Sequence, residues 1–180
     1  MEKDIVYFDL ETRRTAADVG GWNHKEKMGI SVAVTFSTRE NAYRIYTEEE
    51  AGDLIRQLQR ADLVVGYNHV GFDYGVLMAH TVLDLRESLQ SLDLLIDLEK
   101  KLGHRLKLDA VASATLGGLS KTADGLDAIR WWQQGKIVEI AEYCCYDVKV
   151  TKCVHEYGVQ HGHVKYLDRN KREQIVEVNW

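Results

Sequence analysis

The sequence predicts an α/β fold whose mixed β-sheet begins with an antiparallel hairpin. Three strand-like segments come first, and strand-like and helix-like segments then alternate along the chain. This order is typical of an α/β layout. The chain has 180 residues, 45% of them hydrophobic, which is enough for a core without disulfides or structural metals. No repeat or linker divides it, so we expect a single domain over residues 1–180.

Five segments have the composition of β-strands. The first is a short apolar run that precedes an acidic pair, which indicates a buried strand. The second and third are rich in β-branched and aromatic residues and are separated by a short polar turn, which predicts a hairpin. The fourth is apolar throughout, and the fifth is short. In order, they are residues 5–10, 28–36, 41–46, 63–67 and 91–95.

The helices are predicted from capping residues and apolar spacing. Thr47 and Glu50 have the spacing of a capping box, and Leu54, Ile55 and Leu58 then form an apolar stripe. Since the chain contains no proline, the other boundaries come from Gly, Asn and Asp. The remaining helices are expected directly after the fifth strand, ending near Gly103, and at residues 72–80, 108–116, 127–134 and 137–157, the last ended by Gly158.

Charge and cysteine content argue against several classes of protein, although they do not exclude an enzyme that acts on nucleic acid. The formal net charge is −5, which argues against binding nucleic acid through a broadly basic surface. The stretch from Lys165 to Arg172 is locally basic, and we expect a solvated helix or tail face there. An odd number of cysteines without a secretion signal indicates free thiols in a reducing cytoplasm. No apolar run approaches the ~20 residues of a membrane span, so we expect no membrane partner.

Asp9 and Glu11 follow the first apolar run directly. Because side chains alternate along a strand, these two carboxylates share a face. They repel each other unless a cation lies between them, and Mg²⁺ and Mn²⁺ prefer oxygen ligands. An acidic pair is common on protein surfaces, but this one lies at the sheet edge where α/β proteins usually bind ligands.

Three further candidates lie on other elements. Asp73 follows the fourth strand, where a carboxylate in the first turn of a helix also has the simpler role of complementing the macrodipole. Tyr143 and Asp147 are four residues apart on the last helix, so they share one helix face. A phenol beside a carboxylate site can orient a water molecule. Alone, that pair would more often be a core tyrosine and a surface aspartate.

Together these motifs resemble the DEDD superfamily of 3′–5′ exonucleases, which has the ribonuclease H-like fold and would give a mixed five-stranded sheet here. The run Phe8-Asp9-Leu10-Glu11-Thr12, the run Asn68-x-x-x-Phe72-Asp73 and the run Tyr143-x-x-x-Asp147 come in the family's order. Glu142 stands where the histidine variant has His, so the tyrosine variant (DEDDy) is implied. The nearest group is the YprB-like predicted exonuclease domains, and the resemblance covers residues 4–157.

The resemblance implies a metal-dependent reaction. Two divalent ions, Mg²⁺ or Mn²⁺, would lie between the carboxylates. Asp9 would bridge both ions, Glu11 and Asp147 would complete the site that activates water, and Asp73 would serve the second ion. Tyr143 would position the attacking water. The implied products are nucleoside 5′-monophosphates released from single-stranded DNA or RNA 3′ ends by a two-metal-ion mechanism.

The resemblance also suggests substrate contacts. Leu10 and Thr12 would meet the terminal nucleotide, Asn68 would lie near the strand path, and Lys121 is a candidate phosphate contact. Four other residues are weaker candidates, because a structural role explains each of them equally well or better. Trp22, Trp131 and Trp132 could stack on bases or pack in the core. His69 could contact a phosphate or fill the loop.

Other functions stay open at this point. The chain could be a catalytically weak nuclease-like module that binds nucleic acid and works with a helicase or polymerase, or a ribonuclease H-like endonuclease. A zinc site is a further alternative, although the spacing of its candidate ligands matches no common zinc pattern. Those ligands are Cys144, Cys145, Cys153, His155, His161 and His163.

Overall fold

Five strands form one mixed sheet in the computed structural model, which describes residues 3–118 and 125–180. The strand order is β3-β2-β1-β4-β5. β1 pairs antiparallel with β2 and β2 with β3, whereas β1–β4 and β4–β5 are parallel pairs. The predicted α/β class and the initial hairpin are therefore confirmed. The strands are β1 (Ile5–Thr12), β2 (Ile30–Ser37), β3 (Ala42–Tyr46), β4 (Leu63–Gly66) and β5 (Ser91–Asp93).

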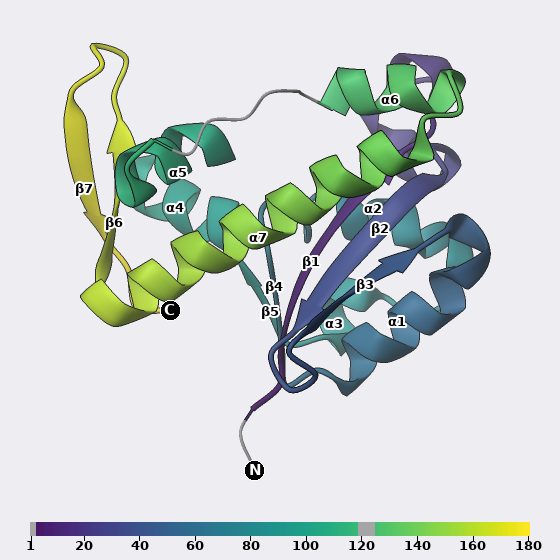
Figure 1. Cartoon of the computed structure of the whole chain (residues 1–180), viewed down its shortest axis with the longest axis horizontal. Coiled ribbons are helices and arrows are strands. Elements are labelled where there is room, and N and C mark those ends of the chain that lie inside the picture. Colours follow the sequence, from purple (N-terminus) through teal and green to yellow (C-terminus); the bar gives the residue numbers. More distant parts are fainter. Residues whose placement is uncertain (1–2, 119–124) are drawn as a thin grey trace.

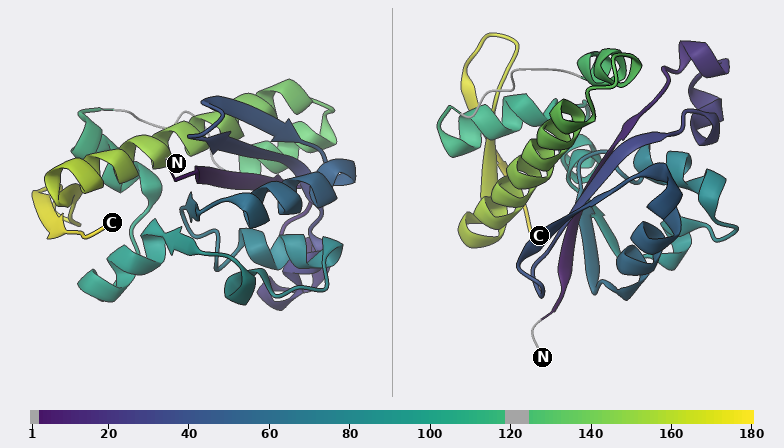
Figure 2. Two further views of the ribbon diagram at one scale, coloured as in Figure 1. Left: turned by 90° about the horizontal axis from the view of Figure 1, so that it is seen from below. Right: turned by 45° about the vertical axis from the view of Figure 1, so that its right-hand side comes forward.

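Helices cover both faces of this sheet (Figure 2). One core cluster includes Tyr7 of β1 and packs under the last helix, and a second includes Val6, Phe8 and Leu10 on the opposite face. This alternation is what a strand buried on both faces requires. The helices are α1 (Ala51–Arg60), α2 (Asp73–Leu77), α3 (Leu85–Ser88), α4 (Leu94–Leu102), α5 (Leu108–Leu116), α6 (Gly125–Gln133) and α7 (Ile137–His161), with short 3₁₀ turns η1 (Ala17–Val19), η2 (Trp22–Lys27), η3 (Glu48–Glu50) and η4 (Met78–His80).

β1 extends well past its parallel neighbour. Its pairing with β4 stops at Tyr7 opposite Val65, but its pairing with β2 continues to Thr12 opposite Ile30. Residues 8–12 therefore belong to a strand that is paired on one side only. The predicted strand ended at residue 10, before this projecting part was complete.

Helix α7 crosses one face of the sheet (Figure 1) and runs to His161, where Gly162 ends it with φ 71°. The predicted end at Gly158 is wrong. Gly158 lies inside the helix, where an added Cβ would come within 2.4 Å of the Trp180 ring. This glycine allows a close approach of the C-terminal segment and does not terminate the helix.

The basic stretch near the C-terminus forms a β-hairpin, so the predicted helix or tail is also wrong. β6 (His163–Leu167) pairs antiparallel with β7 (Glu173–Glu177). Val164 and Tyr166 are buried against the body of the protein, and this alternation stabilises a strand. The hairpin lies beside α5 and its tip projects beyond it (Figure 1).

Within the two described ranges, no helix combines the length and apolar composition needed to cross a bilayer. Cys144, Cys145 and Cys153 are free thiols, as predicted.

Candidate functional site

Three carboxylates converge where β1 projects past β4. Asp9 and Glu11 lie on one face of β1, and Asp147 reaches them from α7, which packs across β1 and β2. One oxygen from each lies within 4.8 Å of the others. Residues 136 positions apart in the sequence thus form one acidic group, which the strand spacing and the helix spacing alone did not predict.

Asp73 has a different environment from these three. Its side chain is buried, and its Oδ1 accepts a hydrogen bond from the Leu10 N–H at 2.9 Å. That N–H belongs to the part of β1 that β4 does not cover, so Asp73 satisfies an edge donor that would otherwise be buried without a partner. Burial raises the pKa of the Asp73 carboxyl well above its usual value, and the nearby charge of Asp9 raises that pKa further.

Cys144 contacts Asp9 from the helix side. Its thiol lies 3.4 Å from both the backbone carbonyl and Oδ2 of Asp9. Burial, followed by the charges of Asp9 and Glu11, raises the pKa of this thiol, so it stays protonated and donates to Asp9. Among the described residues, the group suited to a metal contains carboxylates and no cysteine, which gives the zinc alternative no support.

Asp93 holds the loop after β4 in place. Its carboxylate accepts the backbone N–H groups of Asn68 at 2.8 Å and Val70 at 3.0 Å, and it also caps α4. Asn68 takes a left-handed conformation with φ 67°, and its Oδ1 accepts a hydrogen bond from Arg105 at 2.8 Å. His69 is buried against Gly66, and desolvation lowers its pKa to about 4. Its burial favours the loop-filling role over a phosphate contact.

A polar cleft of about 600 Å³ opens beside the carboxylates. Asp9, Asn68, Tyr143 and Asp147 line it, together with side chains from the segment that leads into α5. The most significant of these are the cations Arg105 and Lys107, which alternate with apolar Leu106 and Leu108 just before α5. That alternation of charge and apolar side chains was the available signal.

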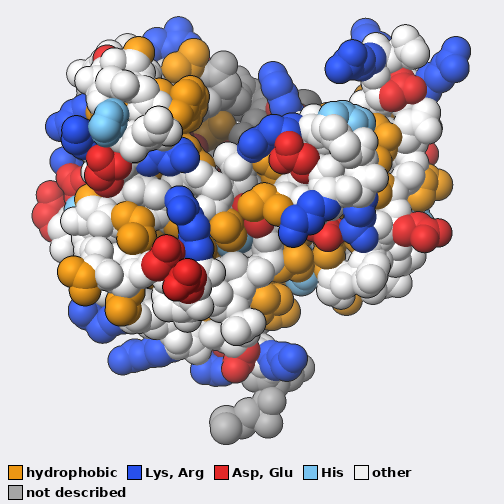
Figure 3. Space-filling view, turned by 180° about the vertical axis from the view of Figure 1, so that it is seen from behind, with side chains coloured by type: hydrophobic (Ala, Val, Ile, Leu, Met, Phe, Trp, Pro, Cys, Tyr) orange, Lys and Arg blue, Asp and Glu red, His pale blue; other side chains and the backbone are white. Residues whose placement is uncertain are grey.

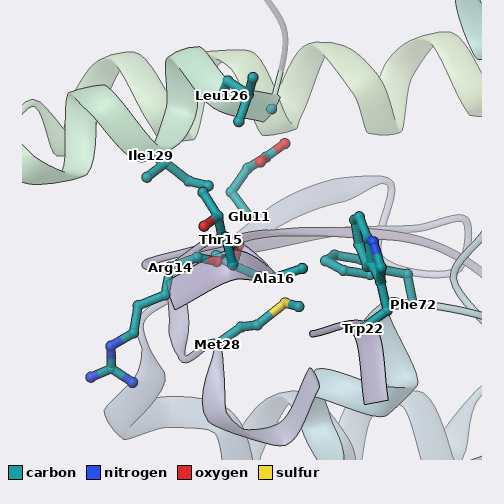
Figure 4. Close-up of a pocket in the computed structure, with 12 residues that line it drawn as sticks. Glu11, Arg14, Thr15, Ala16, Trp22, Met28, Phe72, Leu126 and Ile129 are labelled. Carbon is teal, nitrogen blue, oxygen red and sulfur yellow. Dashed lines mark hydrogen bonds between the residues drawn. The ribbon is translucent and has the colours of Figure 1, made fainter. Parts of the chain in front are cut away.

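An apolar pocket of about 590 Å³ borders Glu11 on the other side. In Figure 4, Leu126 and Ile129 reach toward Glu11 from α6, and Trp22 and Phe72 stand together across the pocket. The two rings are 6.1 Å apart in an edge-to-face arrangement, and Trp22 is 65% exposed. A planar apolar ligand of the size of a nucleobase would fit such a pocket.

The predicted substrate contacts fall in different places. Thr12 lines the apolar pocket and Asn68 lines the polar cleft. The Leu10 side chain is packed in the core on the far face of β1, which leaves only its backbone for the predicted contact. Lys121 lies outside the described residues.

Two tryptophans of α6 are half-buried structural residues. Trp131 packs edge-to-face on Tyr143 at 6.1 Å, so it fixes the position of a residue that lines the polar cleft. Trp132 lies under the guanidinium of Arg13, 4.4 Å from the ring centre. Their positions favour packing over base stacking, and Trp22 is the exposed ring of the predicted three.

The carboxylate group fits a hard divalent cation. Its donors are all oxygens, they come from two rigid elements, and their mutual repulsion is relieved when a cation lies between them. Mg²⁺ and Mn²⁺ prefer such ligands, whereas zinc sites usually contain nitrogen or sulfur. The donor set therefore suits a site for Mg²⁺ or Mn²⁺.

The fold and this acidic group define an α/β protein of the ribonuclease H type. A match to the RNase_H superfamily covers residues 6–159, so the chain belongs to that superfamily, and this membership supports a nuclease that acts on nucleic acid. Among solved structures, the chain is similar to the family B DNA polymerase from the hyperthermophilic archaeon Pyrobaculum calidifontis, with a TM-score of 0.64 and 16% identity. The match covers 88% of this chain but 25% of the polymerase, and it shows the shared fold. No curated protein matches the chain.

Proposed function

We propose that the protein is a metal-dependent 3′–5′ exonuclease of the DEDDy type that removes mononucleotides from single-stranded nucleic acid. The observation that carries this proposal is the position of the carboxylates between two dissimilar cavities. Glu11 borders the apolar pocket, and Asp9 and Asp147 border the polar cleft.

This arrangement suits cleavage next to a chain end. A terminal base in the apolar pocket and the preceding backbone in the polar cleft would place the bond between the last two nucleotides beside the acidic group. The two cavities together are therefore complementary to the end of a nucleic-acid strand, and each cleavage releases one nucleotide.

Asp9, Glu11 and Asp147 would hold the divalent ions, with Asp73 as the fourth acid of the motif. When bound, such ions supply Lewis acidity that activates water and stabilises the leaving oxygen. Tyr143 lines the same cleft as Asp9 and Asp147 and would orient the attacking water by a hydrogen bond. Cys144 would hold the Asp9 carboxylate in position, and the Trp22–Phe72 pair would hold the terminal base.

The test uses matched DNA and RNA oligonucleotides labelled at the 5′ end, with Mn²⁺, for the wild type and Asp147→Asn. We expect a ladder that shortens one nucleotide at a time, which Asp147→Asn abolishes and Glu142→Gln, an exposed change on the same helix, does not. Early release of the labelled 5′ nucleotide would show that degradation starts at the 5′ end and would contradict the proposed 3′–5′ direction. Cleavage of circular single strands would identify an endonuclease instead. Binding of either oligonucleotide without turnover would identify a binding module.

A further inference from the structure

A second hollow continues from the polar cleft toward the β6–β7 hairpin. It has a volume of about 680 Å³ and is lined by residues 104–106 and by the outer part of the hairpin, residues 166–170. Arg105 and Leu106 line both cavities. A depression therefore runs from the carboxylates, over the loop before α5, to the tip of the hairpin.

Exposed cations line this depression alongside Asp9, Asp109, Asp147 and Asp168. The formal net charge of the chain is −5, yet Arg105, Lys107 and Arg169 line the depression, and two more exposed cations follow Arg169 on the hairpin tip. Within residues 3–118 and 125–180, none of them forms an ion pair, whereas Lys165 farther down the hairpin is paired with Glu173. In Figure 3, Lys and Arg side chains gather at the projecting hairpin tip, at the upper right. The five cations are Arg105, Lys107, Arg169, Lys171 and Arg172.

The acidic residue at the tip has a structural role. The Asp168 carboxylate accepts the backbone N–H groups of Asn170 at 2.8 Å and Arg172 at 2.9 Å, and the side-chain amide of Gln174 at 3.1 Å. Its oxygens thus accept hydrogen bonds within the turn, and the neighbouring cations are exposed. The tip is therefore a small cationic surface whose turn is stabilised by the single carboxylate of Asp168.

The hairpin is fixed to the body of the protein. The Thr115 hydroxyl donates to the Lys165 carbonyl and accepts the Lys165 N–H, both at 2.9 Å. At the end of the chain, the Trp180 indole N–H donates to Asp97 at 2.8 Å, and the Trp180 ring packs over Gly158. The tip is therefore held at a set position relative to the cleft, and it points to the same side of the molecule as the carboxyl end of β1 (Figure 1).

We propose that the β6–β7 hairpin tip binds the sugar–phosphate backbone of the same single strand whose end occupies the carboxylate site, several nucleotides upstream of the cleaved bond. This inference rests on the proposed function and extends it. The tip, residues 168–172, carries three cations and no aromatic ring, so it contacts phosphates and not bases. The contact is consequently independent of sequence and dependent on strand length and on salt.

The test compares the binding of short and long strands in EDTA, where turnover cannot interfere. Fluorescence anisotropy is measured with labelled oligonucleotides of about 4 and about 16 nucleotides, the limits of site size in single-strand-binding folds. The variant Arg169→Gln, Lys171→Gln, Arg172→Gln should bind the long strand about tenfold more weakly. The slope of log K against log salt should become shallower by about 2, because three phosphate contacts each contribute about 0.7. Affinity for the short strand should not change.

The matched control removes three exposed cations from the region of α1 and the N-terminus, through Lys3→Gln, Arg56→Gln and Arg60→Gln. It makes the same change in net charge away from the hairpin. Equal losses in the two triple variants would mean that net charge is the cause, and would overturn the proposal. Equal losses for short and long strands, or no loss at all, would also overturn it.

Two further measurements keep the outcomes separate. Thermal unfolding followed by circular dichroism checks that the hairpin variant is folded, and the single change Arg169→Gln repeats the test with less disturbance, for an expected loss of about twofold to threefold. If the wild type shows length-dependent, hairpin-dependent binding but no hydrolysis with Mn²⁺, the nuclease proposal fails while the hairpin contact stands. If the wild type and the hairpin variant both hydrolyse short and long strands with the same KM, the hairpin proposal fails and the nuclease proposal stands.

Discussion

Removing one charge from the acidic group should stabilise the metal-free protein. Asp147→Asn keeps the shape of the side chain and abolishes its repulsion with Asp9 and Glu11, whose oxygens lie within 4.8 Å of it. At this separation each pair of unit charges costs about 0.9 kcal/mol in water and about 3.5 kcal/mol at an effective dielectric constant of ~20. Asp147 belongs to two of the three pairs, and Asp9 and Glu11 are only half-buried. We therefore expect a gain near the lower limit, about 2 kcal/mol.

The assay is thermal unfolding in EDTA and in Mn²⁺. A gain of about 2 kcal/mol raises the Tm by about 4–8 °C in a chain of this size, so Asp147→Asn should melt above the wild type in EDTA. With Mn²⁺ at ~100 times its Kd, the wild type gains about 2.7 kcal/mol, and the variant gains little because it has lost a ligand. The order of the two melting temperatures should therefore reverse when metal is added.

The control is Glu142→Gln, which removes a negative charge from the exposed side of the same helix. It should leave both melting temperatures within about 2 °C of the wild type, as surface changes usually do. A loss of stability for Asp147→Asn in EDTA would show that Asp147 is held by favourable contacts and that the repulsion argument is wrong. A rise with Mn²⁺ of the same size in wild type and variant would show that Asp147 is not a ligand.

Three further outcomes follow from single contacts. Burial raises the Asp73 pKa, so the folded state binds this proton more tightly than the unfolded state. The free energy of unfolding of the metal-free protein should therefore fall as pH rises through the folded-state pKa. Urea unfolding in EDTA at several pH values should show a smaller fall for Asp73→Asn than for the wild type. Tyr143→Phe should lower kcat about 100-fold and leave the Mn²⁺-induced shift in Tm unchanged. Gly158→Ala should cost about 1–3 kcal/mol by displacing the Trp180 ring, and in a Trp180→Ala background the same change should become neutral or stabilising, since alanine is favoured in helices.

The sequence predicts those parts of the fold that depend on neighbours along the chain. The apolar run before Asp9 and the capping box at Thr47 have local causes, and the structure contains both the strand and the box. The side-chain periods also place Asp9 with Glu11 on one strand face and Tyr143 with Asp147 on one helix face. That these two faces meet is a tertiary fact, and only the resemblance to a family indicated it.

The C-terminal hairpin shows what local reasoning lacks. A glycine after a long helical pattern usually marks a helix end, but Gly158 is required by a ring that arrives 22 residues later in the chain. Val164 and Tyr166 do alternate with polar residues, yet five residues of alternation beside a run of charge do not separate a strand from a tail. The segment forms a strand because it packs against α5, a contact that the local sequence does not show.

The early end of β4 links the irregularity of the sheet to the chemistry of the site. If β4 continued beside β1, its backbone would occupy the space in which the Asp73 carboxylate now accepts the Leu10 N–H. The edge of β1 would be closed at the residues that carry Asp9 and Glu11. Instead, β2 pairs with one edge of this part of β1, the Asp73 carboxylate accepts the Leu10 N–H at the other edge, and α7 packs on the strand with the Cys144 thiol against Asp9. The carboxylates are thereby held close together before a cation binds. Their mutual repulsion lowers the stability of the folded protein, and the free energy of cation binding is not reduced by bringing them together.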